Sequence, residues 1–271
     1  EKNSKADDVY ALRVTSEESV NKDLSSIETT LNKDAIDDYV SLIKPYIAKS
    51  MYPGSPLVAW DMLALLAQEK QASYDVLDNV NLHLSELHPS AFETVKQWMQ
   101  ASSFHCHHRD GLELLNALIP PKPNRGLVLI DPPYEQAKEY AHLVDAMSKA
   151  LNKWQNGVYA IWYPLLSPTR IDRLSGEVVL SPKHDCSNSM LTSFVELATR
   201  HQVGLLKVEF AQQLPSENVG MFGSGMVIFN PPWQLDVSLT SVLECLVHSN
   251  DMNNGPDLAD LSHVEILVPN P

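Results

Sequence analysis

Short apolar segments alternate with amphipathic segments along most of the chain. Six of the short segments are expected to be β-strands, at residues 80–86, 103–108, 126–131, 157–163, 204–210 and 224–230. Apolar residues at helical spacing occupy the intervals, at residues 89–101, 111–118, 135–154, 188–201 and 234–248. Parallel strands require long crossover connections, which such helices supply. The alternation therefore predicts an α/β fold in which a mostly parallel sheet has helices on both faces.

The first fifty residues lack this alternation and are polar. Within them, residues 34–49 place apolar side chains on one helical face. Ser55 and Pro56 are suited to begin a further helix, over residues 56–68, because serine caps helices and proline favours their first turn. We expect a small helical subdomain at residues 1–51, within the same domain as an α/β core at residues 52–271.

Composition limits the kinds of partner. The formal net charge of −14 excludes a small basic protein that holds nucleic acid through its total charge, although a local basic groove stays open. Three scattered cysteines do not make a disulfide framework. Because the sequence has neither a long apolar run nor a signal peptide, we expect a soluble, cytoplasmic protein. Since residue 1 is glutamate, we also expect the natural N-terminus to lie upstream.

Three successive predicted strands lead into acidic residues, at Glu86, Asp110 and Asp131. Ligands of α/β folds bind at the carboxyl ends of the strands, where acids accept hydrogen bonds from ribose hydroxyls or an adenine amine. Acids at such positions also cap helices, and Asp110 before Gly111 fits that structural role. The sequence leaves both interpretations open.

The segment Asp131-Pro132-Pro133-Tyr134 has the most specific chemistry. Both prolines have a fixed φ and donate no hydrogen bond, so the turn is rigid. The Asp131 carboxylate and the Pro132 carbonyl are then able to accept hydrogen bonds from one exocyclic amine, while Tyr134 stacks on the ring that bears it. Two acceptors stabilise the positive charge that develops on this nitrogen when it is methylated by a sulfonium donor.

A second turn, Asn230-Pro231-Pro232-Trp233, also follows a predicted strand and fits the same loose pattern. We assign the chemistry to Asp131, because it is the third in the run of acids at strand ends. Asn230 is interpreted as part of a structural connection to the helix at 234–248.

Metal chemistry is disfavoured by the spacing of histidines and cysteines. In a strand, His105 and His107 share one face, while Cys106 and His108 share the other. No second pair at zinc spacing follows, so packing or surface roles are favoured over a metal site. The HxE and PCxxC motifs of zinc nucleobase deaminases are absent as well.

Aromatic and cationic side chains near the Asp131 segment are candidates for nucleic-acid contacts. Trp162 and Tyr163 end a predicted strand and are able to line a base pocket, although aromatic strand residues more often belong to the core. Five cations are able to form a phosphate-binding patch, although solvated surface charge is the commoner role: Lys122, Arg125, Lys138, Arg170 and Arg173.

These motifs resemble those of the RlmJ family, the bacterial 23S ribosomal RNA adenine-N6 methyltransferases. The resemblance covers most of the chain from residue 52 onward and is carried by Tyr52-Pro-Gly-Ser-Pro-Leu57, Glu86-Leu-His-Pro89, Asp110-Gly111, Arg125 through Glu135, Tyr159-Ala-Ile-Trp-Tyr-Pro164 and Gly223-Ser-Gly-Met226 running to Trp233. It implies a Rossmann-like class I methyltransferase fold, with S-adenosylmethionine as methyl donor and no metal. It also implies that the cofactor is contacted by Ser55, Glu86, Asp110, Gly111 and Asp131. The catalytic positions that it implies are Asp131, Pro132, Pro133 and Tyr134.

The resemblance further implies a nucleic-acid substrate, expected to be 23S ribosomal RNA, whose target adenine is unpaired or flipped. The family opens with a histidine-rich basic segment and a strand that leads to a glycine-rich loop. Neither lies in these residues, whose first glycine is Gly54, and we expect both upstream of Glu1.

Other functions stay open. Relatives of the family have been described as proteins needed for using external DNA as a nutrient, so a non-catalytic nucleic-acid-binding or DNA-uptake protein that retains the fold is the alternative. A nuclease is a third reading, disfavoured because no lysine closely follows an acidic pair. The sequence identifies neither the target nucleotide nor the oligomeric state, for which a monomer is favoured.

Overall fold

The computed structural model describes residues 33–69, 82–98, 104–252 and 256–271. The chain divides into two compact units, residues 1–114 and 115–271, and each is described by itself. The boundary falls within helix α6 (Gly111–Leu118). The helical subdomain at residues 1–51 stays a prediction, because residues 1–32 lie outside the described part of the chain.

Two helices open the described part of the first unit. Helix α2 (Lys33–Ile47) packs against helix α3 (Ser55–Glu69), and the Tyr46 hydroxyl donates a 2.6 Å hydrogen bond to the Asp61 carboxylate between them. The Gly54 carbonyl accepts the first hydrogen bonds of α3. Both predicted helices are thus confirmed, with Ser55 inside α3 rather than just before it.

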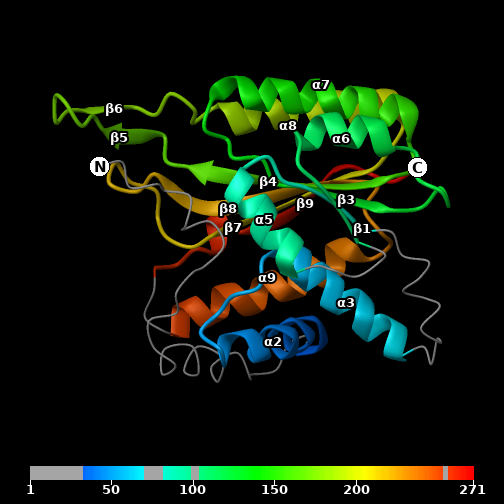
Figure 1. The fold of residues 1–271 in the computed structure, drawn as a ribbon. Coiled ribbons are helices and arrows are strands. Elements are labelled where there is room, and N and C mark those ends of the chain that lie inside the picture. The colour runs from blue at the N-terminus through cyan, green and yellow to red at the C-terminus, as the bar shows by residue number, and fades with distance from the viewer. Residues whose placement is uncertain (1–32, 70–81, 99–103, 253–255) are drawn as a thin grey trace. The chain divides into compact units, whose positions relative to one another are not determined.

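The first unit also contains a two-stranded parallel sheet (Figure 1). Strand β1 (Leu82–Ser85) pairs with β2 (Phe104–His107), and helix α5 (Pro89–Trp98) lies between them in the chain. These elements match the predicted strands and helix. Residues 80, 81 and 103 of the predicted strands and residues 99–101 of the predicted helix fall outside the described residues.

The second unit is built on a five-stranded mixed sheet. Its strands stand in the order β3 (Leu127–Ile130), β4 (Val158–Leu166), β8 (Met221–Phe229), β7 (Leu205–Ala211) and β9 (His263–Val268). The β3–β4 pair is parallel, whereas β8 is antiparallel to both β4 and β7, and β9 is antiparallel to β7. The predicted α/β class is confirmed, with fewer parallel pairs than expected. The reason is that the chain between β7 and β8 is too short for a crossover.

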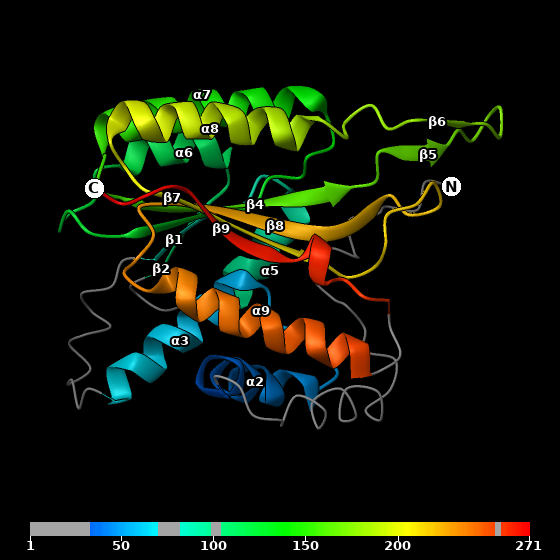
Figure 2. The same ribbon diagram turned by 180° about the vertical axis from the view of Figure 1, so that it is seen from behind.

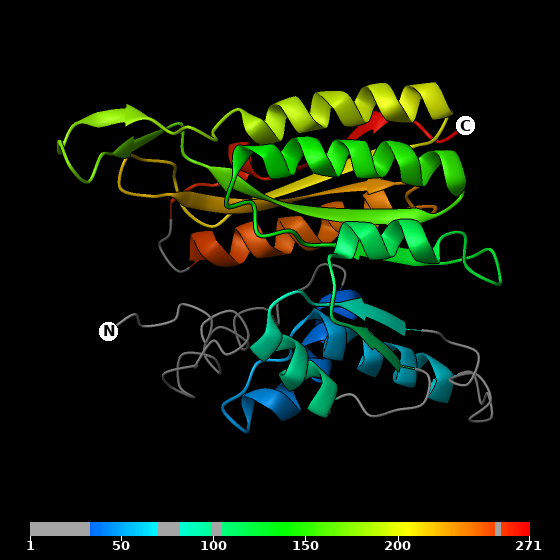
Figure 3. The same ribbon diagram turned by 45° about the horizontal axis from the view of Figure 1, so that its top comes forward.

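Helices cover both faces of this sheet (Figures 2 and 3). Helices α7 (Ala137–Lys153) and α8 (Cys186–His201) lie side by side on one face. The Phe194 ring of α8 meets the Phe229 ring of β8 edge to face, with 5.3 Å between the ring centroids. Helix α9 (Leu235–Met252) lies on the other face. There its apolar side chains pack against a buried cluster formed by Ala160, Leu206 and Ile228.

A hairpin that the sequence did not predict separates β4 from α8. Its strands are β5 (Thr169–Ile171) and β6 (Val178–Leu180), and they pair antiparallel. The Ser181 N–H donates to the Pro168 carbonyl at 2.8 Å and so closes the base of the hairpin. At the tip, the Leu174 side chain is 98% exposed. Among the described helices, none is both long and apolar enough to cross a membrane.

Candidate active site

Asp131 lies where the sequence placed it, directly after β3 at the carboxyl end of the parallel β3–β4 pair. Its side chain reaches solvent, yet the protein around it removes enough water to raise the pKa of the carboxyl above the usual value for aspartate. A carboxylate that has lost part of its hydration but can still be reached from solvent is stabilised when it accepts a hydrogen bond from a ligand. The position therefore suits an acceptor for the amine of an incoming base.

Tyr134, at the end of the same turn, is oriented differently from the prediction. Its φ of 49° is in the left-handed region, and the side chain is only 2% exposed. The ring packs 4.5 Å from Tyr140, and its hydroxyl donates a 2.7 Å hydrogen bond to the Trp162 carbonyl. Because the ring belongs to the core here, it stacks on a base only if the turn rearranges.

Lys183 contacts the same turn from the segment between the base of the hairpin and α8. Its ammonium group donates hydrogen bonds to two successive carbonyls, that of Tyr134 at 2.5 Å and that of Glu135 at 3.1 Å. This residue was not among those predicted from the sequence. Nothing in the local pattern marks a lysine 49 positions away in the chain as a partner of the turn.

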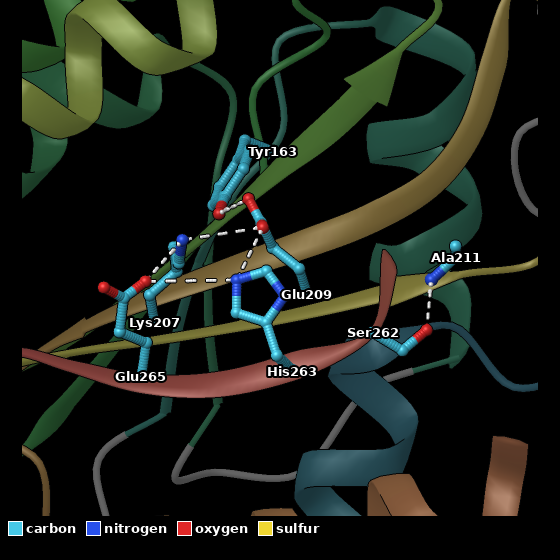
Figure 4. Close-up of polar contacts among 7 residues, drawn as sticks. All are labelled: Tyr163, Lys207, Glu209, Ala211, Ser262, His263 and Glu265. Atoms are coloured by element: carbon cyan, nitrogen blue, oxygen red, sulfur yellow. Dashed lines mark hydrogen bonds and ion pairs between the residues drawn. The ribbon is translucent and has the colours of Figure 1, made fainter. Parts of the chain in front are cut away.

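Tyr163, within β4 and three residues before its end, anchors a polar network on the face of the sheet (Figure 4). The ring is fully buried, and its hydroxyl donates to the Glu209 carboxylate at 2.7 Å. Burial together with the negative charge of Glu209 raises the pKa of Tyr163 far above its usual value. Lys207 and His263 also approach the Glu209 carboxylate, at 3.6 and 3.3 Å. Tyr163 is thus a buried structural residue rather than an exposed wall of a base pocket.

Glu86 and Asp110 both lie at the carboxyl end of the small parallel sheet in the first unit. Glu86 follows β1 and donates its N–H to the His107 carbonyl of β2, while Asp110 follows three residues after that strand ends. The Ser85 hydroxyl donates to the Arg109 carbonyl at 2.7 Å and links the two segments. The structure therefore brings these two acids to the same edge.

Asp110 has the capping role that the sequence left open. Its Oδ1 accepts hydrogen bonds from the N–H groups of Leu112 and Glu113, at 2.9 and 3.0 Å, at the start of α6. Both bonds use the same oxygen, so the cap does not require Oδ2. Gly111 and Ser55 are the exposed first residues of α6 and α3.

The second proline turn follows β8, at the end of the five-stranded sheet opposite to the end that bears Asp131. Because β8 is antiparallel to β4, Phe229 pairs with Tyr159 near the start of β4, and Asn230 follows there. The Asn230 amide donates to the carbonyls of Gln155 and Gly157, at 2.7 and 2.8 Å. These contacts fit the structural connection that the sequence analysis proposed for Asn230.

Comparison with known proteins places the chain in a family. The family model described as "Ribosomal RNA large subunit methyltransferase D, RlmJ" matches residues 28–256. The chain belongs to this family. It is 30% identical over 233 residues to ribosomal RNA large subunit methyltransferase J of Escherichia coli K12, an alignment that covers 84% of this chain and 71% of the relative. The Haemophilus influenzae protein of the same name is 32% identical over 224 residues, with 81% and 68% covered.

A solved structure has the same fold. The crystal structure of the Legionella pneumophila protein LPL1258 superposes with a TM-score of 0.60 at 25% identity, and it covers 85% of this chain and 73% of that protein. The predicted resemblance to the RlmJ family and the predicted methyltransferase fold class are both confirmed.

Three histidines of this RlmJ-family chain, His83, His105 and His107, gather on one face of the β1–β2 sheet. The rings of His105 and His107 both stack on His83, at centroid distances of 4.7 and 5.4 Å, and His83 Nδ1 lies 3.1 Å from His107 Nε2. Desolvation lowers the pKa of both His83 and His107. His105 and His107 share a face, as predicted. No group of three or more potential ligands is arranged to hold a metal ion within the described part of the chain.

The five cations expected to contact phosphate all have exposed side chains: Lys122, Arg125, Lys138, Arg170 and Arg173. Arg170 lies 3.8 Å from the Asp172 carboxylate, so part of its charge is compensated. A phosphate-binding patch in this RlmJ-family chain stays a prediction.

Proposed function

We propose that the protein methylates an adenine of ribosomal RNA at its exocyclic N6, with S-adenosylmethionine as methyl donor and 23S ribosomal RNA as the substrate. Membership of the RlmJ family and the names of the two relatives support methyl transfer to ribosomal RNA. The observation that supports the finer chemistry is the solvent-accessible Asp131 carboxylate, placed in a rigid turn at the carboxyl end of two parallel strands.

Asp131 is proposed to act on the amine directly. The lone pair of an aromatic amine is delocalised into the ring, so the nitrogen is a weak nucleophile. Hydrogen bonds donated by that amine to the Asp131 carboxylate and the Pro132 carbonyl favour a pyramidal nitrogen and stabilise its developing positive charge. Because desolvation already raises the pKa of Asp131, the carboxylate has more to gain from such a donor than a fully hydrated acid.

The residues of the first unit fit part of a cofactor site. Carboxylates at the ends of adjacent parallel strands accept hydrogen bonds from ribose hydroxyls and adenine amines, and Glu86 and Asp110 supply two such groups at one edge. We propose that they hold S-adenosylmethionine, with Ser55 and Gly111 as further contacts. When bound, this cofactor supplies an electrophilic methyl group.

The target adenine is proposed to enter unpaired or flipped, because its amine is inaccessible within a duplex. Exposed cations such as Arg125 and Lys138 are proposed to contact the phosphates beside it. Ribosomal RNA would be met in the cytoplasm, the location predicted from the sequence. The names of the relatives do not favour the non-catalytic alternative.

A transfer assay with isotopically labelled S-adenosylmethionine and 23S ribosomal RNA tests the proposal. The wild-type chain should incorporate label into N6-methyladenine, and Asp131→Ala should abolish incorporation without changing the melting temperature by more than a few degrees. Asp145→Ala removes an exposed acid from α7 and is the matched control, expected to be fully active. Unchanged turnover in Asp131→Ala would reject the catalytic assignment. Calorimetry that detects no binding of the cofactor would favour the non-catalytic alternative.

A further inference from the structure

We propose that Lys183 is a positioning residue for this reaction, because it holds the backbone of the turn that bears Asp131. The inference rests on the proposed function. Lys183 lies outside the proline turn and is 48 and 49 residues from the carbonyls that it contacts. No motif pointed to it.

The turn needs an external partner because it has few hydrogen bonds of its own. Residues 131–135 are neither strand nor helix, and Pro132 and Pro133 have no N–H to donate. Beyond the turn, Gln136 and Glu139 form a reciprocal capping box that fixes the start of α7. The segment from Asp131 to Glu135 therefore depends on contacts made by side chains.

Two such contacts hold the segment from different elements. The Tyr134 hydroxyl reaches the Trp162 carbonyl of β4 at 2.7 Å, and the Lys183 ammonium group reaches the Tyr134 and Glu135 carbonyls at 2.5 and 3.1 Å. The positive φ of Tyr134 is a strained conformation for a residue other than glycine, and it persists only where surrounding contacts impose it. Loss of the Lys183 contacts would let this residue relax and displace the turn.

Displacement of the turn should affect the chemical step more than binding. A shift of about 1 Å in a reacting group can lower turnover by about 100-fold. Of the proposed cofactor contacts, only Asp131 lies in this turn, whereas Ser55, Glu86, Asp110 and Gly111 lie outside it. Cofactor affinity should therefore change less than turnover. An ammonium group donates in several directions, and a guanidinium group retains the charge and several donors. Arginine should therefore restore part of the turnover that methionine loses.

The chain offers a matched control for a lysine bound to a backbone carbonyl. Lys153 donates to the Asn116 carbonyl at 2.7 Å, at the end of α7 within the same unit. Replacement of Lys153 by methionine removes a contact of the same chemical kind without touching the proline turn. Its effect measures what such a contact contributes to stability alone.

The experiment compares Lys183→Met, Lys183→Arg and Lys153→Met in the full chain, with kcat, the KM for each substrate and the melting temperature as readouts. We expect Lys183→Met to lower kcat by roughly 10- to 100-fold, while its KM for S-adenosylmethionine stays within about twofold of the wild-type value. Lys183→Arg should recover part of the lost kcat. Lys153→Met should keep the wild-type kcat. A wild-type kcat in Lys183→Met, or an equal loss in Lys153→Met, overturns the positioning role alone. A wild-type chain that transfers no methyl group overturns the proposed function as well.

Discussion

Gly225 of β8 separates Tyr163 on β4 from Glu209 on β7, since it pairs with both residues. A Cβ atom added at Gly225 would lie 2.2 Å from Tyr163 Cζ and 2.6 Å from its hydroxyl oxygen. The Tyr163 ring cannot keep its position beside such an atom. Gly225→Ala should therefore displace the ring and break its hydrogen bond to Glu209.

The expected cost has two parts that share one cause. Overpacking a core typically costs about 1–3 kcal/mol. The Tyr163 hydroxyl bonds to a charged acceptor, and such a bond contributes about 1.5–3 kcal/mol. Because displacement of one ring produces both effects, we expect about 3 kcal/mol in total rather than their full sum. For a unit of this size, that loss lowers the melting temperature by roughly 6–12 °C.

Denaturant unfolding of four proteins tests the cause: the wild type, Gly225→Ala, Tyr163→Val and the double variant. In the Tyr163→Val background, the alanine methyl enters space that the ring has vacated. There Gly225→Ala should be neutral or stabilising, because alanine loses less backbone entropy than glycine on folding. A coupling energy of about 3 kcal/mol between the two sites is expected. The same destabilisation in both backgrounds would refute the steric explanation.

Three further predictions concern single residues. Desolvation raises the pKa of Asp131, so its carboxylate becomes protonated at a higher pH than an ordinary aspartate of pKa 3.8. As the pH drops through that raised pKa, kcat/KM should fall. Asp131→Asn should lower activity and remove this acidic limb from the pH–rate profile. Asn230→Ala removes two hydrogen bonds and should lower the free energy of unfolding by about 1–3 kcal/mol. Methyl transfer per folded molecule should not change. A variant that folds but is inactive would contradict the structural role of that turn. Asp110→Ala should lose about 1 kcal/mol of helix capping, whereas Asp110→Asn should keep the cap. If Asp110→Asn binds S-adenosylmethionine more weakly in calorimetry, Asp110 contacts the cofactor in addition to capping the helix. Unchanged binding would leave only the capping role.

Local periodicity predicted most of the elements because strands and helices differ in the spacing of their apolar residues. Helix α6 lies where the pattern placed it, and β3 ends and β4 begins within one residue of the predicted positions, although β4 continues to Leu166. Strand β9 was not predicted, although its residues Val264, Ile266 and Val268 are apolar at strand spacing. Strand direction was not predictable either, since it depends on the length of connections and on pairing that is set by the whole sheet.

The candidate site was predictable as far as sequence motifs extend. The position of Asp131 at a strand end follows from the pattern, and so does the edge shared by Glu86 and Asp110. The burial of Tyr134 does not, because a left-handed φ in a residue other than glycine depends on tertiary contacts. The contact with Lys183 joins residues that are distant in the chain, and no local pattern encodes it.

The hairpin between β4 and α8 has a consequence for protein engineering. The Ser181 N–H closes its base on the Pro168 carbonyl, and Lys183 follows after the closure. The strands beyond the base can therefore change length without moving the ammonium group. The exposed turn near Leu174 is accordingly a suitable place to insert a peptide tag or a fluorescent label while the proline turn at Asp131 still assembles.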